Sequence, residues 1–406
     1  MKNKQIYFLF SANFAIYFIG TGLFPLLPIY ATTFGASKSI IGIYMAITYI
    51  SLTSGTLFSR LAAGALGPKR VFVGAGVLGV LGVILLGQAA ALWQAIILSA
   101  VVWFTGGLGL ALIAVFIGQS VQKTKRGKSF GIIFLSFPLA SLLSGLTVGP
   151  IFEWHGTNMM FIFLGAVYAI WPLVGWLFVK VNPIVTIKTT QTQSAETFGK
   201  PFYLLLIMTF LPSIAMYAGR LGISFTMTSL DFSVSAISST TAVAGLVTIP
   251  LAIVLGTWSD KLGRQLFLLL CFMLVAVSGI LLSTSTQLWQ FWLASILIQV
   301  ANAVRGSIFP AYATDILPPK RLAAGLTWLN GINGFAGILG LALTGLIIEQ
   351  AGTTTLFVGA ASLALVCLAI LGVISGNKLV TAVQKSHNYV STQVRNHQLK
   401  RANAVS

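Results

Sequence analysis

The feature that most constrains this chain is a succession of apolar runs, each long enough to cross a bilayer as a helix and separated from the next by a short polar break. In lipid, only helices and closed barrels satisfy their own backbone hydrogen bonds, and these runs lack the alternation of barrel strands. Because 57% of the residues are hydrophobic and only 7% are charged, the composition excludes an ordinary soluble domain. The sequence therefore predicts an all-α polytopic membrane protein.

Twelve such runs follow one another along the chain. They cover residues 6–30, 39–59, 70–91, 94–119, 130–151, 158–180, 202–224, 237–257, 265–284, 289–311, 324–347 and 353–376. The first run is too long for the core of a signal peptide and has further spans behind it, so we expect it to remain as a helix. The two cysteines, Cys271 and Cys367, fall inside apolar runs and give no information about the redox compartment.

The distribution of positive charge predicts the orientation, because Lys and Arg are retained on the cytoplasmic side of a membrane. With the N-terminus inside, 21 of the 24 Lys and Arg residues are cytoplasmic, Lys38 alone is outside, and Arg220 and Arg305 fall within helices. The net charge of +18 is therefore an orientation signal and does not indicate nucleic-acid binding. We expect a multi-pass protein of the cytoplasmic membrane with both termini in the cytoplasm.

The twelve runs divide into two sets of six that resemble each other. The stretch TTFGASKSIIGIYMAITYI aligns with SLDFSVSAISSTTAVAGLV when Phe34 is set on Phe232, and Gly67 then falls near Gly263. Repeat-built secondary transporters have this organisation, with a substrate site between the repeats. We expect two pseudo-symmetric six-helix bundles at residues 1–180 and 202–376. A cytoplasmic linker at 181–201 joins them, and a basic cytoplasmic tail follows at 377–406.

A polar stretch, GTWSDKLGRQ at residues 256–265, lies between the eighth and ninth runs. It resembles the signature loop of transporters of the major facilitator superfamily. The matching residues are Gly256, Asp260, Lys261, Gly263 and Arg264, with Gln265 at the second basic position. In the first half the corresponding stretch, RLAAGALGPKR, has Gly64 or Pro68 where the acid belongs. The resemblance implies the twelve-helix fold of that superfamily and a gating loop that holds one alternating-access state. The alternative is a solvated turn whose charges keep the loop cytoplasmic.

The fifth run contains a second, weaker resemblance. In LLSGLTVGPIFEW, Gly145, Gly149 and Pro150 are similar to the antiporter motif of the drug-efflux branch, although Glu153 and Trp154 replace its following glycine pair. Small residues that allow close helix packing explain the same spacing equally well. In the family's fourth helix, an arginine before a Gly-rich turn is tied to proton coupling. Here Trp103 occupies that place.

Acidic residues are scarce, and none falls in the middle of a predicted span. The six are Glu153, Glu196, Asp231, Asp260, Asp315 and Glu349. Proton-driven transporters usually carry a titratable group in the membrane, so Asp315 and Glu153, the nearest to the spans, are the candidates for proton coupling. No Ser/His pair, carboxylate pair or set of metal ligands occurs at membrane depth, so we expect neither an enzyme nor a metal or cofactor.

Arg220 and Arg305 are cations within the predicted seventh and tenth spans. The family resemblance implies that the first, fourth, seventh and tenth helices line the cavity, and a buried cation is costly unless it meets water or an anion. Both are therefore candidate substrate-binding residues. The alternatives are that Arg220 extends to the outer surface and that Arg305 bonds helix carbonyls. Further polar candidates on the spans, each able instead to join helices by hydrogen bonds, are Asn13, Tyr17, Gln299, Asn302, Asn330 and Asn333.

These features predict a secondary transporter, of the efflux type, that moves a small organic solute by alternating access as a monomer in the lipid bilayer, with a proton as the possible coupling ion. One alternative is an organic-anion exchanger or facilitator that uses Arg220 and Arg305. Another is a membrane sensor, which would normally carry a soluble signalling domain larger than the thirty-residue tail at 377–406.

Overall fold

A computed structural model describes residues 2–120, 131–179 and 198–402 of the protein, and within that part of the chain all regular structure is helical. The helices are α1 (Lys2–Leu23), α2 (Leu27–Thr32), α3 (Lys38–Leu66), α4 (Pro68–Leu86), α5 (Leu92–Ser120), α7 (Ser136–Tyr168), α8 (Ile170–Phe178), α9 (Lys200–Ser229), α10 (Val234–Leu262), α11 (Arg264–Ser283), α12 (Leu288–Ile316) and α13 (Pro319–Ala402). The predicted all-α polytopic class is confirmed. Most of the predicted linker at 181–201 lies outside the described residues.

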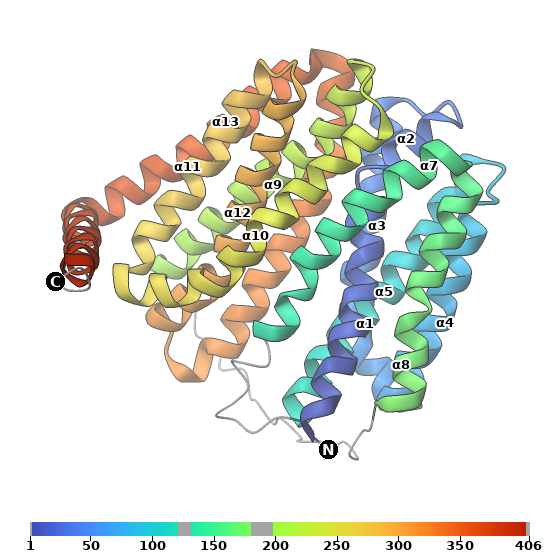
Figure 1. Ribbon diagram of the computed structural model, residues 1–406, viewed down its shortest axis with the longest axis horizontal. Coiled ribbons are helices and arrows are strands. Elements are labelled where there is room, and N and C mark those ends of the chain that lie inside the picture. Colours follow the sequence, from blue (N-terminus) through green and yellow to red (C-terminus); the bar gives the residue numbers. More distant parts are fainter. Residues whose placement is uncertain (1, 121–130, 180–197, 403–406) are drawn as a thin grey trace.

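Ten stretches of the described helices are long and apolar enough to span a membrane. Eight have 18 to 30 residues, whereas Gly131–Phe178 and Ala324–Gly372 have 48 and 49. Each of these long stretches contains one glycine with non-helical backbone, Gly156 (φ 80°, ψ 177°) or Gly352 (φ 83°, ψ 170°). Both glycines lie where the sequence separates two apolar runs. Figure 1 shows the chain rising along α7 and descending again towards α8. Dividing the two long stretches at these glycines turns ten stretches into twelve, which is the number of spans that the sequence predicts.

The two halves repeat each other with an offset of 196 residues. The helices α3 and α10 both have 29 residues and start at Lys38 and Val234. The residues with positive φ form three pairs with the same offset: Gly35 with Asp231, Gly67 with Gly263, and Gly156 with Gly352.

The alignment that set Phe34 on Phe232 implies an offset two residues larger than the observed 196, so that alignment is wrong. The counterpart of Phe34 is Leu230. Both residues precede the helix starts, and the register is set by the helix starts and turn glycines rather than by an aromatic residue in the loop.

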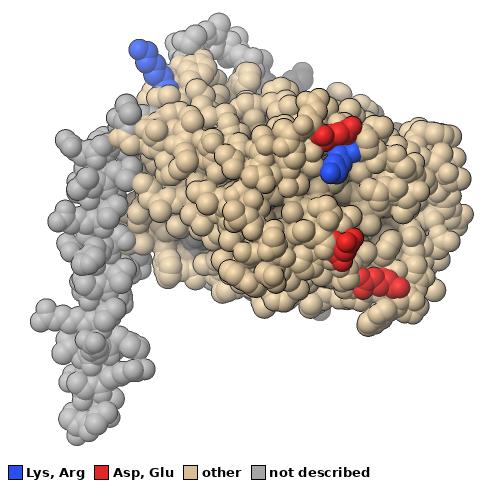
Figure 2. All heavy atoms as spheres, turned by 90° about the horizontal axis from the view of Figure 1, so that it is seen from above, with Lys and Arg blue, Asp and Glu red and all other residues tan. Residues whose placement is uncertain are grey.

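The halves lie side by side, with α1 to α8 on one side and α9 to α13 on the other (Figure 1). Across the boundary, α3 packs against α13 and α7 packs against α10. The N-terminus lies at one end of this bundle. We refer to that end as the inner end and to the opposite one as the outer end, following the predicted orientation. Figure 2 shows the outer face, which is largely uncharged apart from a few acidic and basic side chains.

Candidate functional site

Two cavities lie near the boundary between the halves. The first, of about 40 Å³, is called the hydroxyl cavity here because most of its polar lining consists of hydroxyl groups. Its polar lining residues besides Arg220 are Ser141, Ser224, Thr240, Thr241, Ser295 and Gln299. The second, of about 110 Å³, is called the aromatic cavity. Its rings belong to Tyr17, Phe24, Tyr49, Trp103, Phe137 and Tyr168.

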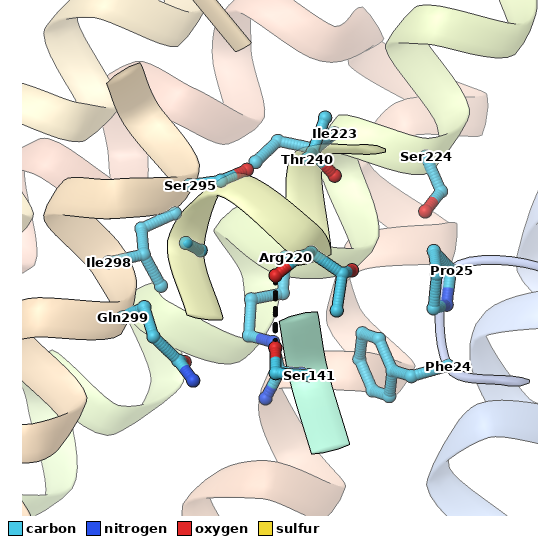
Figure 3. Close-up of a pocket in the computed structure, with 12 residues that line it drawn as sticks. Phe24, Pro25, Ser141, Arg220, Ile223, Ser224, Thr240, Ser295, Ile298 and Gln299 are labelled. Carbon is cyan, nitrogen blue, oxygen red and sulfur yellow. Dashed lines mark hydrogen bonds between the residues drawn. The ribbon is translucent and has the colours of Figure 1, made fainter. Parts of the chain in front are cut away.

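Phe24 and Arg220 line both cavities. The Arg220 guanidinium lies 4.5 Å from the centre of the Phe24 ring, which is within the range of a cation–π contact. Phe24 is placed by the break between α1 and α2, where Pro25 has no N–H to continue a helix. In Figure 3, Arg220 lies between Phe24 on one side and Gln299 on the other. The pair therefore forms the junction of the two cavities.

Phe24 and Arg220 are also corresponding positions of the two halves, since their numbers differ by the repeat offset of 196. Two equivalent positions that touch each other lie on the pseudo-twofold axis that relates the halves. The cation is thus at the boundary between the halves, close to that axis.

The other interior arginine lies elsewhere. Arg305 donates from Nη2 to the Asn302 side-chain oxygen at 2.7 Å, and neither residue lines either of the two cavities. The Arg305 Nε is buried and finds no hydrogen-bond partner among the described residues, and the same holds for the Asn333 side-chain oxygen. The structure therefore separates Arg305 from Arg220.

The remaining polar candidates fall into three environments. Tyr17 lines the aromatic cavity and Gln299 lines the hydroxyl cavity. Asn13 is buried and donates to the Ser136 hydroxyl at 2.7 Å and to the Ile133 carbonyl at 3.3 Å, so it joins α1 to the start of α7. Asn330 is exposed on α13.

Sequence reasoning missed Phe24 and Ser224 as site residues. The FPLLP stretch after Leu23, with two prolines inside an apolar run, was the available signal for the break that positions Phe24.

The signature loop joins two helices of the same half. Gly263 (φ 93°) forms the turn between α10 and α11, whereas Gly256 is helical within α10. Gly256 therefore belongs to the helix and not to the turn, because α10 continues to Leu262. Asp260 and Lys261 belong to the last turn of α10, and their side chains lie outside the described part of the structure.

Arg264, the last residue of the motif, contacts the end of α12. Its Nη1 lies 3.0 Å from the Asp315 Oδ2 and donates to the Ala311 carbonyl. Asp315 is half exposed and lines neither cavity. The contact fastens the start of α11 to the end of α12 within the second half. Glu196, the remaining inner acid besides Asp260, lies outside the described residues.

At the outer end, a glutamate from each half reaches the first turn of a helix of the other half. Glu153 on α7 accepts a hydrogen bond from the Ser235 backbone N–H on α10 at 2.9 Å, and the Ser235 hydroxyl also contacts its carboxylate. Glu349 on α13 accepts from the Ser39 backbone N–H on α3 at 2.6 Å. The two glutamates differ by 196 in number, and so do the two serines. The two contacts are therefore pseudo-symmetric copies.

The same boundaries are closely packed by glycines. A methyl group added at Gly145 of α7 would lie 2.4 Å from the backbone nitrogen of Ala242 on α10, and one added at Gly149 would lie 2.7 Å from the Ser238 Cβ. Across the other boundary, a methyl group at Gly42 of α3 would lie 2.9 Å from the Gly345 Cα of α13. Pro150 lies within α7 next to this packed segment. The outer parts of the two boundaries therefore leave no room for side chains at these positions.

Comparison with known proteins places this architecture in a family. The sequence pattern of the Major Facilitator Superfamily matches residues 9–224 and 205–388. Multidrug resistance protein MdtG of Salmonella choleraesuis is 24% identical over 309 residues, covering 71% of this chain and 74% of that protein. The uncharacterised transporter YfkF of Bacillus subtilis is 27% identical over 371 residues, covering 82% and 86%. The hexuronate transporter of Bacillus subtilis is 23% identical over 279 residues, covering 61% and 65%.

Solved structures show the same fold. A peptide transporter POT in complex with sulfate has a TM-score of 0.72 at 16% identity and covers 90% of this chain and 94% of its own. A bacterial homolog of the human lysosomal transporter Spinster, in an inward-facing and unoccupied conformation, has a TM-score of 0.69 at 14% identity and covers 95% and 97%. Together with the sequence match over both halves, this shows that the chain belongs to the Major Facilitator Superfamily.

Proposed function

We propose that this protein is a secondary transporter that exports a small organic solute across the cytoplasmic membrane by alternating access. The observation that carries the proposal is the position of the two cavities at the boundary between two pseudo-symmetric halves. At the outer end these halves are in contact through closely packed glycines and through Glu153 and Glu349. A rocking motion of one half against the other would expose such a site to each side in turn.

The direction of transport rests on the relatives. The MdtG protein of Salmonella is named for multidrug resistance, which favours export. The predicted orientation, with the basic loops in the cytoplasm, makes the closed outer end the external one. A solute would then enter from the cytoplasm in the state described here.

Proton coupling has little support from the two acids that the sequence offered for it. Asp315 is paired with Arg264 at the inner end of α12, and Glu153 contacts the start of α10 at the outer end. Neither lines either of the two cavities described above. We therefore propose that transport does not require a proton on either carboxylate.

A second candidate function, exchange or facilitated movement of an organic anion, is favoured by Arg220. Among the described residues, neither cavity is lined by an acidic side chain that would pair with this cation. A relative named as a hexuronate transporter has an organic anion as its named substrate.

The test is solid-supported-membrane electrophysiology on proteoliposomes, with organic anions and lipophilic cations applied with and without a pH gradient. A protein-dependent signal or counterflow for at least one solute is expected. The control is the double variant Ser39→Cys/Glu349→Cys, in which a disulfide would hold the outer end closed. Oxidation should stop transport and reductant should restore it. Liposomes that move no solute beyond protein-free vesicles, across the whole panel, would contradict the proposal.

A further inference from the structure

We propose that the substrate is an amphipathic organic anion, whose charged group binds Arg220 at the hydroxyl cavity while its ring or apolar body occupies the aromatic cavity. This inference rests on the proposed function and specifies the chemical class of its substrate. It depends on four observations about the two cavities: their charge, their shared junction, an unpartnered hydroxyl and the contrast between their linings.

The charge of the site is positive. Arg220 lines both cavities, and no acidic side chain of the described residues lines either one. The described partner of its guanidinium is the Phe24 ring, whose centre lies 4.5 Å away, and no carboxylate of the described residues lines the space around it. A guanidinium in this setting attracts an anion and repels an organic cation.

The hydroxyl cavity contains a buried hydrogen-bonding group without a partner. Ser224 is 1% exposed, and its Oγ makes no hydrogen bond within the described structure. Buried hydroxyl groups are normally paired, since an unpaired one loses its hydrogen bonds to water. Ser224 lies one helical turn beyond Arg220 on α9, and both residues line the hydroxyl cavity. A hydroxyl without a partner can donate to an acceptor such as a carboxylate, sulfonate or phosphate oxygen.

The aromatic cavity is suited to the other end of the ligand. Six of its lining residues are aromatic, and Trp103 among them is 6% exposed. Its volume of about 110 Å³ approaches that of an engineered apolar cavity of ~150 Å³ that binds benzene. Because Phe24 and Arg220 line both cavities, a ligand that spans them would carry its charge close to its ring.

The experiment measures binding separately from transport. The purified, full-length protein in detergent would be titrated with benzoate, benzamide and benzylammonium, and the dissociation constants obtained by calorimetry and by ligand-induced shifts in Tm. These probes share one ring system and differ in charge. We expect the carboxylate to bind at least about tenfold more tightly than the amide or the ammonium, a difference of ~1.4 kcal/mol.

The variants identify the group responsible. Arg220→Ala should weaken carboxylate binding by about tenfold or more and leave amide binding unchanged, and Arg220→Lys should retain part of the affinity because it keeps the charge but loses the guanidinium fork. Ser224→Ala tests the unpartnered hydroxyl without altering charge. Arg60→Ala is the matched control, since Arg60 is an exposed arginine of α3 outside both cavities.

The outcomes separate this inference from the proposed function. Equal binding of the three probes, or a loss produced by Arg305→Ala and not by Arg220→Ala or Arg220→Lys, would overturn the anion site. If solutes still cross the proteoliposome membrane in that case, the transport function stands. If the carboxylate binds through Arg220 but no solute is moved, the site stands and the transport function fails.

A separate set of contacts carries a second inference. We infer that Glu153 and Glu349 act as a paired outer clasp, in which each half of the molecule caps a helix of the other half. Each carboxylate accepts from the second residue of a helix, Ser235 or Ser39. The first N–H groups of a helix lack intrahelical partners and carry partial positive charge, so they bind a carboxylate well. The clasp can exist only while the outer ends of α7 and α10, and of α13 and α3, are together.

Double electron–electron resonance can test the clasp on full-length protein. Spin labels at Thr32→Cys and Thr286→Cys, which are exposed positions on opposite halves, would report the outer separation, while the native Cys271 and Cys367 are buried. Glu153→Ala/Glu349→Ala should add a longer-distance population that wild type lacks, and the milder Glu153→Gln/Glu349→Gln pair should add a smaller one. Gln350→Ala, beside the clasp, is the control. An unchanged distance distribution in both double variants would overturn the clasp.

Discussion

Gly145 on α7 faces Ala242 on α10 so closely that a methyl group in place of the glycine hydrogen would lie 2.4 Å from the Ala242 backbone nitrogen. Overpacking of this kind costs typically ~1–3 kcal/mol, and here the cost applies only when the outer ends of the two halves are together. Gly145→Ala should therefore disfavour the closed outer end and lower the initial rate of solute counterflow by roughly tenfold. The matched control is Gly74→Ala on α4, where the added methyl meets no atom within 4 Å. A Gly145→Ala rate equal to that of the control would contradict the prediction.

The two glycines that break the long helical stretches should tolerate no side chain. Gly156 and Gly352 have φ near 80° and ψ near 180°, a region that is almost restricted to glycine, and strain of this kind costs of order 1–3 kcal/mol. Gly156→Ala and Gly352→Ala should each lower the Tm of the detergent-solubilised protein. Gly359→Ala, in the helical part of α13 with open space around it, should leave the Tm nearly unchanged. If all three variants unfold at the same temperature, the turn at these glycines does not require their backbone conformation.

Asn13 should contribute to stability and not to substrate choice. Its side chain is buried and donates to Ser136 and to the Ile133 carbonyl. Asn13→Ala removes both of these hydrogen bonds, while the Ser136 hydroxyl still donates to the Ile133 carbonyl. At about 0.5–1.5 kcal/mol for each bond, we expect a loss of about 1–3 kcal/mol in the free energy of unfolding. Ser11→Ala, which removes a hydroxyl bonded only to its own helix at Tyr7, is the control. A changed order of preference among transported solutes in Asn13→Ala would show that the residue reaches the substrate after all.

Arg264 should matter more than its ion-pair partner. Asp315 is half exposed, and exposed ion pairs are worth about 0–1 kcal/mol, whereas Arg264 also bonds the Ala311 carbonyl at the end of α12. Thermal unfolding should therefore be affected more by Arg264→Ala than by Asp315→Asn. Asp315→Asn should also keep any response of transport to a pH gradient. Loss of that response would identify Asp315 as the coupling carboxylate and reject its purely structural role.

The fold could be predicted from the sequence because hydrophobic length and charge asymmetry are properties of single segments. The ends of runs such as 130–151 and 158–180 locate the turn at Gly156 without any knowledge of packing. The repeat register was less certain, since the aromatic pair of Phe34 and Phe232 is two residues out of step with the turn glycines.

The site was harder to predict because the sequence does not say which side of a helix faces a cavity. Arg220 and Arg305 look equivalent as cations inside apolar runs, yet only the former lines the two cavities described here. Asn13 and Tyr17 are one helical turn apart on α1, but one joins helices and the other lines the aromatic cavity. Such differences depend on the position of partners that are distant in the sequence.

The contact between Phe24 and Arg220 has a consequence for the history of the chain. If the two halves had identical sequences, the residue at this position would face its own copy across the axis. Two arginines would place like charges against each other, and two phenylalanines would leave the centre without charge. A single cation beside the axis therefore requires that the two halves have diverged at this position, which an assembly of identical halves could not achieve.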